Sequence, residues 1–201
     1  MAERGANVVT LPASAIVHSA GLLLGAACPI VGFAALTALA AQVKVPLPWT
    51  DVPMTLQSPA VLLAGLALSP AASVAAMVLY LCCGAAGLPV FTPGSQGLAG
   101  PTGGYIVGFV AAAWTIAVLR GGLNAPAPRM VAAAFCGMCV LFACGVCWRA
   151  VWASAYGVDP GVAALTGLAP FIPKALIEIG LAVSLVTATR RFRERRFSET
   201  R

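Results

Sequence analysis

Charged side chains are scarce in this chain of 201 residues, of which Asp, Glu, Lys and Arg together make up 9%. A soluble domain carries about 25% charged residues. Hydrophobic residues make up 60% of the chain, and its mean hydropathy is +0.94. A water-soluble fold of this size leaves too much surface exposed to hide so many apolar side chains. The composition therefore excludes an ordinary soluble domain and favours one embedded in a lipid bilayer.

Groups that perform catalysis are scarcer still, with six Asp and Glu residues and a single histidine, His18. An intramembrane enzyme would need a nucleophile and its base, paired carboxylates or a metal cluster within the membrane. The sequence also lacks a Gly-x-x-x-x-Gly-Lys loop for nucleotide phosphates. We therefore expect no catalytic residues and no cofactor, and we expect any ATP hydrolysis to be performed by another chain.

The seven cysteines lie inside apolar runs and do not indicate a disulfide framework. Two Cys-x-x-Cys pairs, Cys136 with Cys139 and Cys144 with Cys147, have a spacing that is typical of metal ligands. On one helix, however, the two pairs would be about 12 Å apart along the axis. One tetrahedral site cannot join them without breaking the helix. We predict no metal site.

Six apolar runs predict about six transmembrane helices, because lipid leaves the backbone no other hydrogen-bond partners. The first run is too long for one untilted span, and we expect Pro29 to kink or interrupt it. A signal peptide is the alternative for its first half, but no clear cleavage site follows. The prediction is one all-α integral membrane domain over residues 14–189 with a basic tail over 190–201. The runs are Ser14–Val43, Thr55–Leu68, Ala71–Leu88, Gly104–Leu119, Met130–Val151 and Phe171–Thr189.

Basic residues are unequally divided between the two sides of this predicted bundle. Nine of the twelve lie on the side of both termini, and six of those are in residues 190–201. The positive-inside rule therefore places both termini in the cytoplasm. A basic tail that directly follows an apolar run is typical of contact with an anionic membrane surface, and we expect no nucleic-acid partner. The connections 44–53, 88–103 and 153–169 then face outward, where an imported solute would meet them.

Polar and aromatic residues gather in these outward connections. The amide of Gln57, about one turn inside the membrane, needs a hydrogen-bond partner on a neighbouring helix or on a ligand. Thr102 is expected to cap the next helix, whose N–H groups would then be open to an acceptor. Glycines around Gly104 would allow a ligand close to the backbone. Apolar walls are expected from Trp49, Phe91 and Tyr105; a glycine-rich connection without a ligand is the alternative.

Ionisable residues within the predicted spans are further candidates for ligand contacts. Lys174 and Glu178 are four residues apart on one helix face, so they either pair with each other or contact a ligand. Arg149 lies near the outer end of the fifth run. It either reaches toward the membrane surface in an aromatic belt or supplies a second cation to a substrate carboxylate.

Three ordered motifs resemble the BioY family, the biotin-binding S components of energy-coupling-factor (ECF) transporters. They are Val-Pro-Met-Thr-Leu-Gln at 52–57, Leu-Tyr-Leu at 79–81 with Gly-Ala-Ala-Gly-Leu-Pro-Val-Phe at 84–91, and Gly-Pro-Thr-Gly-Gly-Tyr at 100–105. The close match covers about residues 45–109 and adds Tyr80 to the candidate site. The resemblance implies a six-helix S-component fold, an outward-facing biotin pocket, and as partners a membrane T component and two ATPase subunits.

The sixth predicted helix departs from the family pattern, in which a proline and an Asp are followed by Lys three residues after the Asp. Here Ala175 stands at the Asp position and Glu178 at the Lys position. If these two residues contact biotin, their chemistry predicts that Glu178 accepts ureido N–H bonds and that Lys174 meets the carboxylate. An S component for a different small vitamin-like solute is the first alternative, and an intramembrane enzyme is a less favoured one.

Small residues form one face of the first predicted helix, at Ala34, Ala38 and Ala41. Such a face allows another helix to approach closely. In S components helix one docks the T component through residues of this kind, so the resemblance implies a docking surface. Packing inside this chain is the alternative use.

Overall fold

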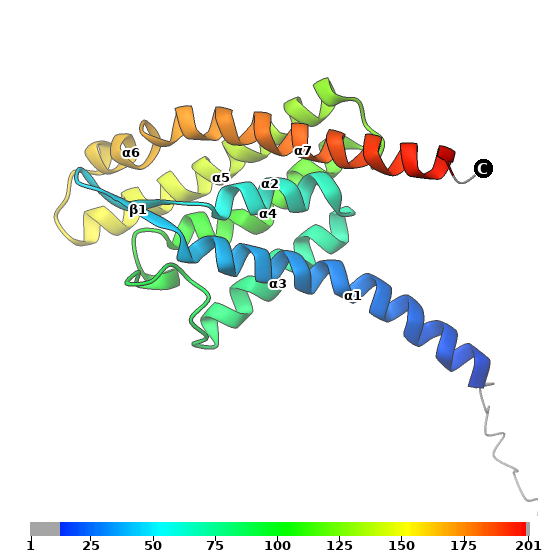
Figure 1. The fold of residues 1–201 in the computed structure, drawn as a ribbon. Coiled ribbons are helices and arrows are strands. Elements are labelled where there is room, and N and C mark those ends of the chain that lie inside the picture. Colours follow the sequence, from blue (N-terminus) through cyan, green and yellow to red (C-terminus); the bar gives the residue numbers. More distant parts are fainter. Residues whose placement is uncertain (1–12, 200–201) are drawn as a thin grey trace, which may run out of the picture.

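The computed structural model describes residues 13–199, except for the side chains of residues 13–24, 26, 197 and 199. Helices dominate it (Figure 1). A hairpin of strands β1 (Lys44–Leu47) and β2 (Thr50–Thr55) follows the first helix, and a 3-10 turn, η1 (Gly97–Ala99), precedes the fourth. The helices are α1 (Ala13–Gln42), α2 (Gln57–Ala67), α3 (Pro70–Ala85), α4 (Gly103–Arg120), α5 (Ala127–Ala155), α6 (Pro160–Leu168) and α7 (Phe171–Glu199).

The helices confirm the predicted all-helical membrane class. In the described part of the chain, α4, α5 and the stretch 160–196 are each long and apolar enough to cross a membrane. The apolar helices α2, α3 and α1 from residue 27 onward are shorter. Each of the six predicted runs coincides with one helix of the structure. Helix α2 has 11 residues and is therefore only about 16 Å long.

The connection after α1 forms an antiparallel hairpin, which was not predicted from the sequence. Lys44 pairs with Thr55, and Leu47 pairs with Thr50. The register is irregular between Val45 and Leu47, where Pro46 has no N–H group to donate to the ladder. The two extended segments around the prolines therefore pair with each other as strands.

Helix α6 lies within the connection 153–169, outside the six predicted apolar runs. Its start carries ordinary helix signals. The Asp159 carboxylate accepts a hydrogen bond from the Val162 N–H at 2.9 Å, and Pro160 occupies the first helical turn. Helix α7 also continues to Glu199, beyond the predicted end of its apolar run at Thr189. Arg and Glu are good helix formers, so the basic segment extends the helix as far as the structure describes it.

The centre of the bundle is α4, which packs along α5 through glycines. Of the α4 residues 61% are buried, against 39% of the most apolar stretch of α5. A Cβ atom on Gly104 would lie 2.2 Å from the Trp148 Cβ, and one on Gly145 would lie 2.2 Å from the Tyr105 Cδ1. No side chain fits at such distances, so these positions require glycine for the helices to meet. The glycines of this contact, here called the α4–α5 seam, are Gly104, Gly108, Gly137 and Gly145.

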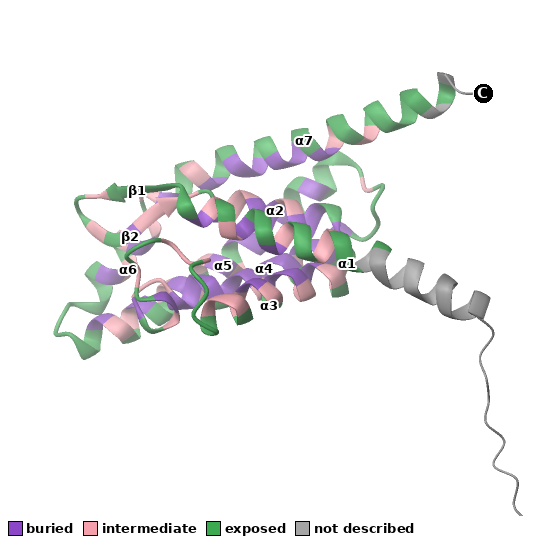
Figure 2. Cartoon of the chain, turned by 60° about the horizontal axis from the view of Figure 1, so that its bottom comes forward, coloured by how far each residue is buried: buried purple, intermediate pink, exposed green. Residues whose placement is uncertain are grey.

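The connections gather at two opposite ends of the bundle (Figure 1). The hairpin, the connection 86–102 and α6 lie together at one end, on the left in Figure 1, which we call the hairpin end. The α4–α5 connection and the C-terminal part of α7 lie at the other end, which we call the Arg120 end. Buried residues concentrate where α2, α4 and α5 face one another, whereas the outer side of α7 is largely exposed (Figure 2).

Arg120 is 1% exposed and ends α4. Its guanidinium donates to the carbonyl oxygens of Leu66, through Nη1, and of Leu68, through Nη2 at 2.9 Å. These carbonyls lie at the C-terminus of α2, where helix carbonyls lack partners within the helix. Arg120 therefore satisfies the last carbonyl groups of a short helix from a buried position.

We expect Arg120→Leu to lower the free energy of unfolding by about 2 kcal/mol, because two buried carbonyls lose their donor. Thermal unfolding of the detergent-purified protein would measure the effect. Arg129→Leu is the matched control, since Arg129 Nε also donates to a carbonyl, that of Leu119 at 3.0 Å, but at an exposed position that water can replace. Equal stability of the two variants would contradict the role of Arg120.

Candidate functional site

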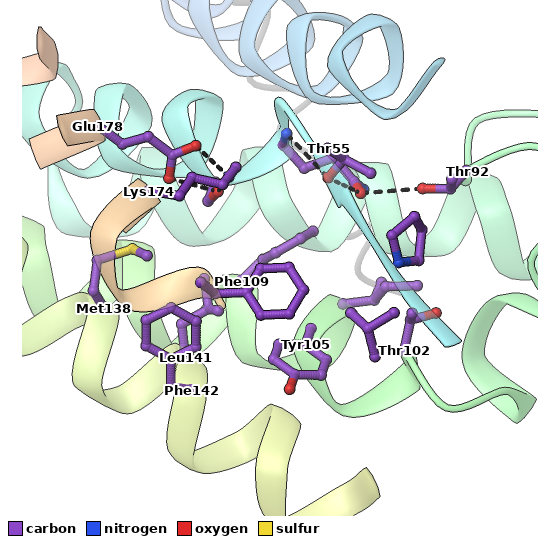
Figure 3. Close-up of a pocket in the computed structure, with 16 residues that line it drawn as sticks. Thr55, Thr92, Thr102, Tyr105, Phe109, Met138, Leu141, Phe142, Lys174 and Glu178 are labelled. Carbon is purple, nitrogen blue, oxygen red and sulfur yellow. Dashed lines mark hydrogen bonds and ion pairs between the residues drawn. The ribbon is translucent and has the colours of Figure 1, made fainter. Parts of the chain in front are cut away.

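A cavity opens between the hairpin and four helices near the hairpin end of the bundle (Figure 3). Its residues come from β2, α2, α4, α5, α7 and the connection before α4. They are Val52, Pro53, Thr55, Gln57, Ser58, Thr92, Thr102, Tyr105, Ile106, Phe109, Met138, Leu141, Phe142, Phe171, Lys174 and Glu178. Most of the wall is apolar, and the polar side chains form two groups (Figure 3).

The apolar wall consists of helix faces that the α4–α5 seam brings together. On α4, Tyr105 and Phe109 are one turn apart and point to the same side. On α5, Met138, Leu141 and Phe142 repeat this spacing. A rigid apolar wall of this kind suits a ligand with a hydrophobic ring system.

The first polar group surrounds the amide of Gln57, which is 5% exposed. Its Nε2 donates to the Tyr80 hydroxyl at 2.7 Å. Its Oε1 accepts from the Thr55 hydroxyl at 2.9 Å and from the Thr92 hydroxyl at 3.2 Å. The expected partner of Gln57 is therefore a network within the chain that joins β2, α2, α3 and the connection before α4. We call it the amide cluster.

Tyr80 and Phe91 form a layer behind the cavity. Tyr80 is 1% exposed, and its ring meets that of Phe91 edge-on at a centroid distance of 5.5 Å. The Phe91 ring in turn covers Gly84, where a Cβ atom would lie 2.1 Å from the Phe91 Cζ. This layer holds the amide of Gln57 in one orientation and does not itself line the cavity.

The second polar group, here called the ionic cluster, joins α7 to α2. Lys174 and Glu178 form an ion pair one turn apart on α7, which is one of the two uses considered for them. The Ser58 hydroxyl donates to Glu178 Oε2 at 2.8 Å and accepts from Lys174 Nζ at 2.8 Å. Glu178 is 6% exposed, so its charge is compensated by these two partners within an apolar surrounding.

The free space inside the cavity is about 70 Å³. Small-molecule sites usually enclose about 300–1,000 Å³. A vitamin-sized ligand therefore fits only after wall side chains or the hairpin move aside. A second hollow, lined by Lys44, Asp51 and Trp152 among others, lies outside the cavity and shares Pro53, Thr92 and Thr102 with it. This outer hollow marks the side from which a ligand would arrive.

Five of the ten predicted ligand residues line the cavity, namely Gln57, Thr102, Tyr105, Lys174 and Glu178. Thr102 precedes α4 as expected, but its side chain makes no capping bond. The Gly103 N–H already donates to Gly100 O at 3.1 Å, so the helix start is less open to a ligand than expected. Gly104 faces Trp148 and not the cavity, because the α4–α5 seam occupies the space beside it.

Arg149 and Trp49 also lie outside the cavity. Arg149 is 5% exposed, and its Nε donates to Ala163 O at 2.8 Å while Nη2 donates to the Thr166 hydroxyl at 3.1 Å. It therefore ties α5 to α6, and Asp51 of the hairpin lies 4.0 Å away. Trp49 is at the hairpin turn and 59% exposed. Their predicted contacts with a ligand have no support in this geometry.

The small-residue face of α1 turns inward. Ala34 and Ala41 are buried, and Ala38 is partly buried against the core. The structure thus favours packing inside the chain, the second of the two uses considered, over a free docking surface. The exposed side of α1 carries larger residues instead, including Val31, Leu36 and Leu39.

Several cavity residues were not singled out from the sequence. Ser58 is adjacent to Gln57, but nothing in its own neighbourhood indicates the ionic cluster, which depends on a contact across 116 residues. Ile106 and Phe109 could have been found, because they follow Thr102 and Tyr105 on one helix face. Within the described residues, no group of three or more His, Cys, Asp or Glu side chains is placed to hold a metal ion.

Comparison with known proteins identifies the family. The model of the BioY family matches residues 13–195. The chain belongs to the BioY family. A relative from Pyrococcus horikoshii, described as a probable biotin transporter BioY, is 35% identical over 75% of this chain and 87% of its own length. The biotin transporter BioY of Thermotoga maritima is 34% identical over 75% of this chain and 86% of its own.

A solved structure shares the fold of this BioY member. The crystal structure of the S-component for biotin from an ECF-type ABC transporter has a TM-score of 0.73 and 20% sequence identity. The match covers 85% of this chain and 93% of that chain. The S-component-like fold that the resemblance implied is therefore confirmed.

Proposed function

We propose that this chain captures biotin for uptake across the membrane, as the S component of an ECF transporter. Membership of the BioY family supports the substrate, because the curated relatives are described as biotin transporters. Those relatives are transporters and not enzymes, and an intramembrane enzyme is set aside on that ground. The observation in the structure that carries the proposal is the ionic cluster beside the apolar wall of the cavity.

The ionic cluster suits the ureido group of biotin. A ureido group offers one acceptor oxygen and two N–H donors, so it needs donors and acceptors side by side. Lys174 and Ser58 supply donors, and Glu178 supplies acceptor oxygens, all within hydrogen-bond distance of one another. A lone carboxylate would be repelled by Glu178 at this place. We therefore assign Lys174 to the ureido oxygen, in place of the carboxylate contact expected from the sequence.

The carboxylate of biotin then points toward the outer hollow. The hydroxyls of Thr55, Thr92 and Thr102 line that part of the cavity, and Thr92 and Thr102 also line the outer hollow. Lys44 lies in the same hollow, where its Nζ donates to Pro93 O at 2.5 Å. Apolar side chains of α4 and α5 would cover the ring system in between. In the proposed arrangement each chemical part of biotin would lie beside side chains that complement it.

Capture alone does not concentrate a solute, since each tenfold gradient costs about 1.4 kcal/mol. The sequence carries no loop for nucleotide phosphates. We therefore propose that a T component and ATPase subunits supply the work. With Ala34 and Ala41 buried, the T component would contact other faces of this chain or would require α1 to shift.

Equilibrium binding of biotin to the detergent-purified protein tests the substrate. We expect tight binding that thiamine does not compete for, and weaker binding of biotin methyl ester because the ester lacks the charge of the carboxylate. A folded sample that binds thiamine or another vitamin in place of biotin would refute the assignment. Such a result would instead favour an S component for a different small vitamin-like solute, the alternative that Ala175 and Glu178 suggest.

Glu178→Gln should weaken biotin binding by about 10- to 100-fold, because charge-assisted bonds to the ureido N–H groups are lost. Isothermal titration with biotin would measure the change. Glu194→Gln is the matched control on the same helix but at the Arg120 end, and it should bind like the unmodified protein. Since Glu178→Gln also leaves Lys174 without its partner, the double variant Lys174→Gln and Glu178→Gln serves as a second test. Unchanged affinity in both variants would rule out the ionic cluster as the ureido site.

The same proposal includes an orientation in the cytoplasmic membrane with both termini inside the cell. Its support is the excess of basic residues at the Arg120 end, to which Arg120, Arg129 and the C-terminal part of α7 contribute. The hairpin end and its cavity would then face outward.

A green fluorescent protein fused to the C-terminus should be fluorescent, and an alkaline phosphatase fused there should be inactive, because each reporter works on one side of the membrane. The paired activities in intact cells measure the orientation. An active phosphatase fusion together with a non-fluorescent green fluorescent protein fusion would show the opposite orientation, with the C-terminus outside the cell.

A further inference from the structure

An open hollow of about 630 Å³ lies at the Arg120 end, between the end of α2, the α4–α5 connection and α7. It has two kinds of wall. The apolar wall includes Leu66, Leu123 and Val186. The charged wall is one face of α7 and consists of Arg190, Arg193 and Glu194. The hollow is separate from the cavity described above, since Arg190 is about 18 Å along α7 from Glu178.

The charged wall has an excess of positive charge. Two arginines and one glutamate leave a net charge of +1 at the hollow. Among the described residues, neither Arg190 nor Arg193 forms an ion pair. Arg190 Nη1 donates to Ala125 O at 3.1 Å, which holds its guanidinium across the hollow and leaves further N–H groups to donate. Paired guanidinium groups favour an oxyanion that accepts several N–H bonds, such as a phosphate.

The position of the hollow along α7 further limits the class of ligand that fits it. The apolar part of α7 ends at Thr189, and five arginines follow between residues 190 and 196. The hollow therefore lies at the boundary between hydrocarbon and headgroups, and Val186 of its apolar wall lies one turn of α7 toward the hydrocarbon from Arg190. Leu123 is 55% exposed there and offers an apolar surface to an acyl chain. A soluble anion would use the charged wall alone, whereas a phospholipid matches both walls.

We infer that this hollow binds one anionic phospholipid, with its phosphate between Arg190 and Arg193 and an acyl chain against Leu123. Basic pockets between membrane helices are a known means of holding anionic headgroups. Glu194 limits the excess charge and disfavours a ligand with many negative charges. The site needs neither biotin nor the ECF partners, so it stands apart from the proposed function.

Native mass spectrometry of the full chain tests the site, using dioleoyl phosphatidylglycerol and dioleoyl phosphatidylcholine as probes. The unmodified protein should retain phosphatidylglycerol in preference to phosphatidylcholine. Arg190→Gln with Arg193→Gln should weaken phosphatidylglycerol binding by about tenfold or more, because both phosphate donors are lost. Should the double variant fail to fold, Arg193→Gln alone replaces it as the test. The single variant keeps the bond from Arg190 to Ala125 and should weaken phosphatidylglycerol binding by a smaller factor.

The matched control is Arg191→Gln with Arg195→Gln, which removes the same charge from α7 residues that do not line the hollow. This control should change phosphatidylglycerol binding by less than about twofold. An equal loss in both double variants would show a general surface attraction and overturn the site. Equal retention of the two lipids by the unmodified protein would overturn it as well. Competition by free glycerol 3-phosphate at lipid-like concentrations would show a soluble phosphate site instead.

Discussion

The close contact between α4 and α5 is the constraint on which the cavity depends. Glycines at the seam let the two backbones approach until Tyr105 lies against the α5 backbone at Gly145. From there the Tyr105 hydroxyl donates to Gly167 O at 2.7 Å, which ties the seam to the end of α6. Trp148 Nε1 donates to Gly100 O at 2.9 Å and anchors the connection that precedes α4. A larger residue at the seam would separate the helices and with them the two halves of the apolar wall.

The polar groups of the cavity are satisfied by one another before any ligand is present. Gln57 has partners on both sides of its amide, and Glu178 has Lys174 and Ser58. A ligand therefore exchanges existing bonds for new ones, and the net gain per bond is modest. Discrimination can still be strong, because an analogue that opens a cluster without replacing its bonds leaves buried groups unpaired.

Local patterns in the sequence predicted the helices, because lipid enforces helices. They also put Lys174 and Glu178 on one helix face and showed that Gln57 needs a partner, but they left open whether the partner of each is the protein or a ligand. The sequence did not predict which residues, distant along the chain, each side chain contacts in the folded structure. Gly104 looked like an approach for a ligand, but its neighbour Trp148 lies on another helix. Arg149 was considered as a cation that contacts the ligand. In the structure it donates a hydrogen bond to a carbonyl of α6, a helix that the sequence did not predict. Ser58 was missed for the same reason.

The narrowness of the cavity has a kinetic consequence. With about 70 Å³ free, the described conformation holds a few waters but no vitamin. Binding then requires an open conformation, and the apparent affinity is the intrinsic affinity reduced by the fraction of molecules that are open. If that fraction is small, association is slower than diffusion, because only the open molecules can bind. The frequency with which the cavity opens then sets how fast a scarce solute is captured.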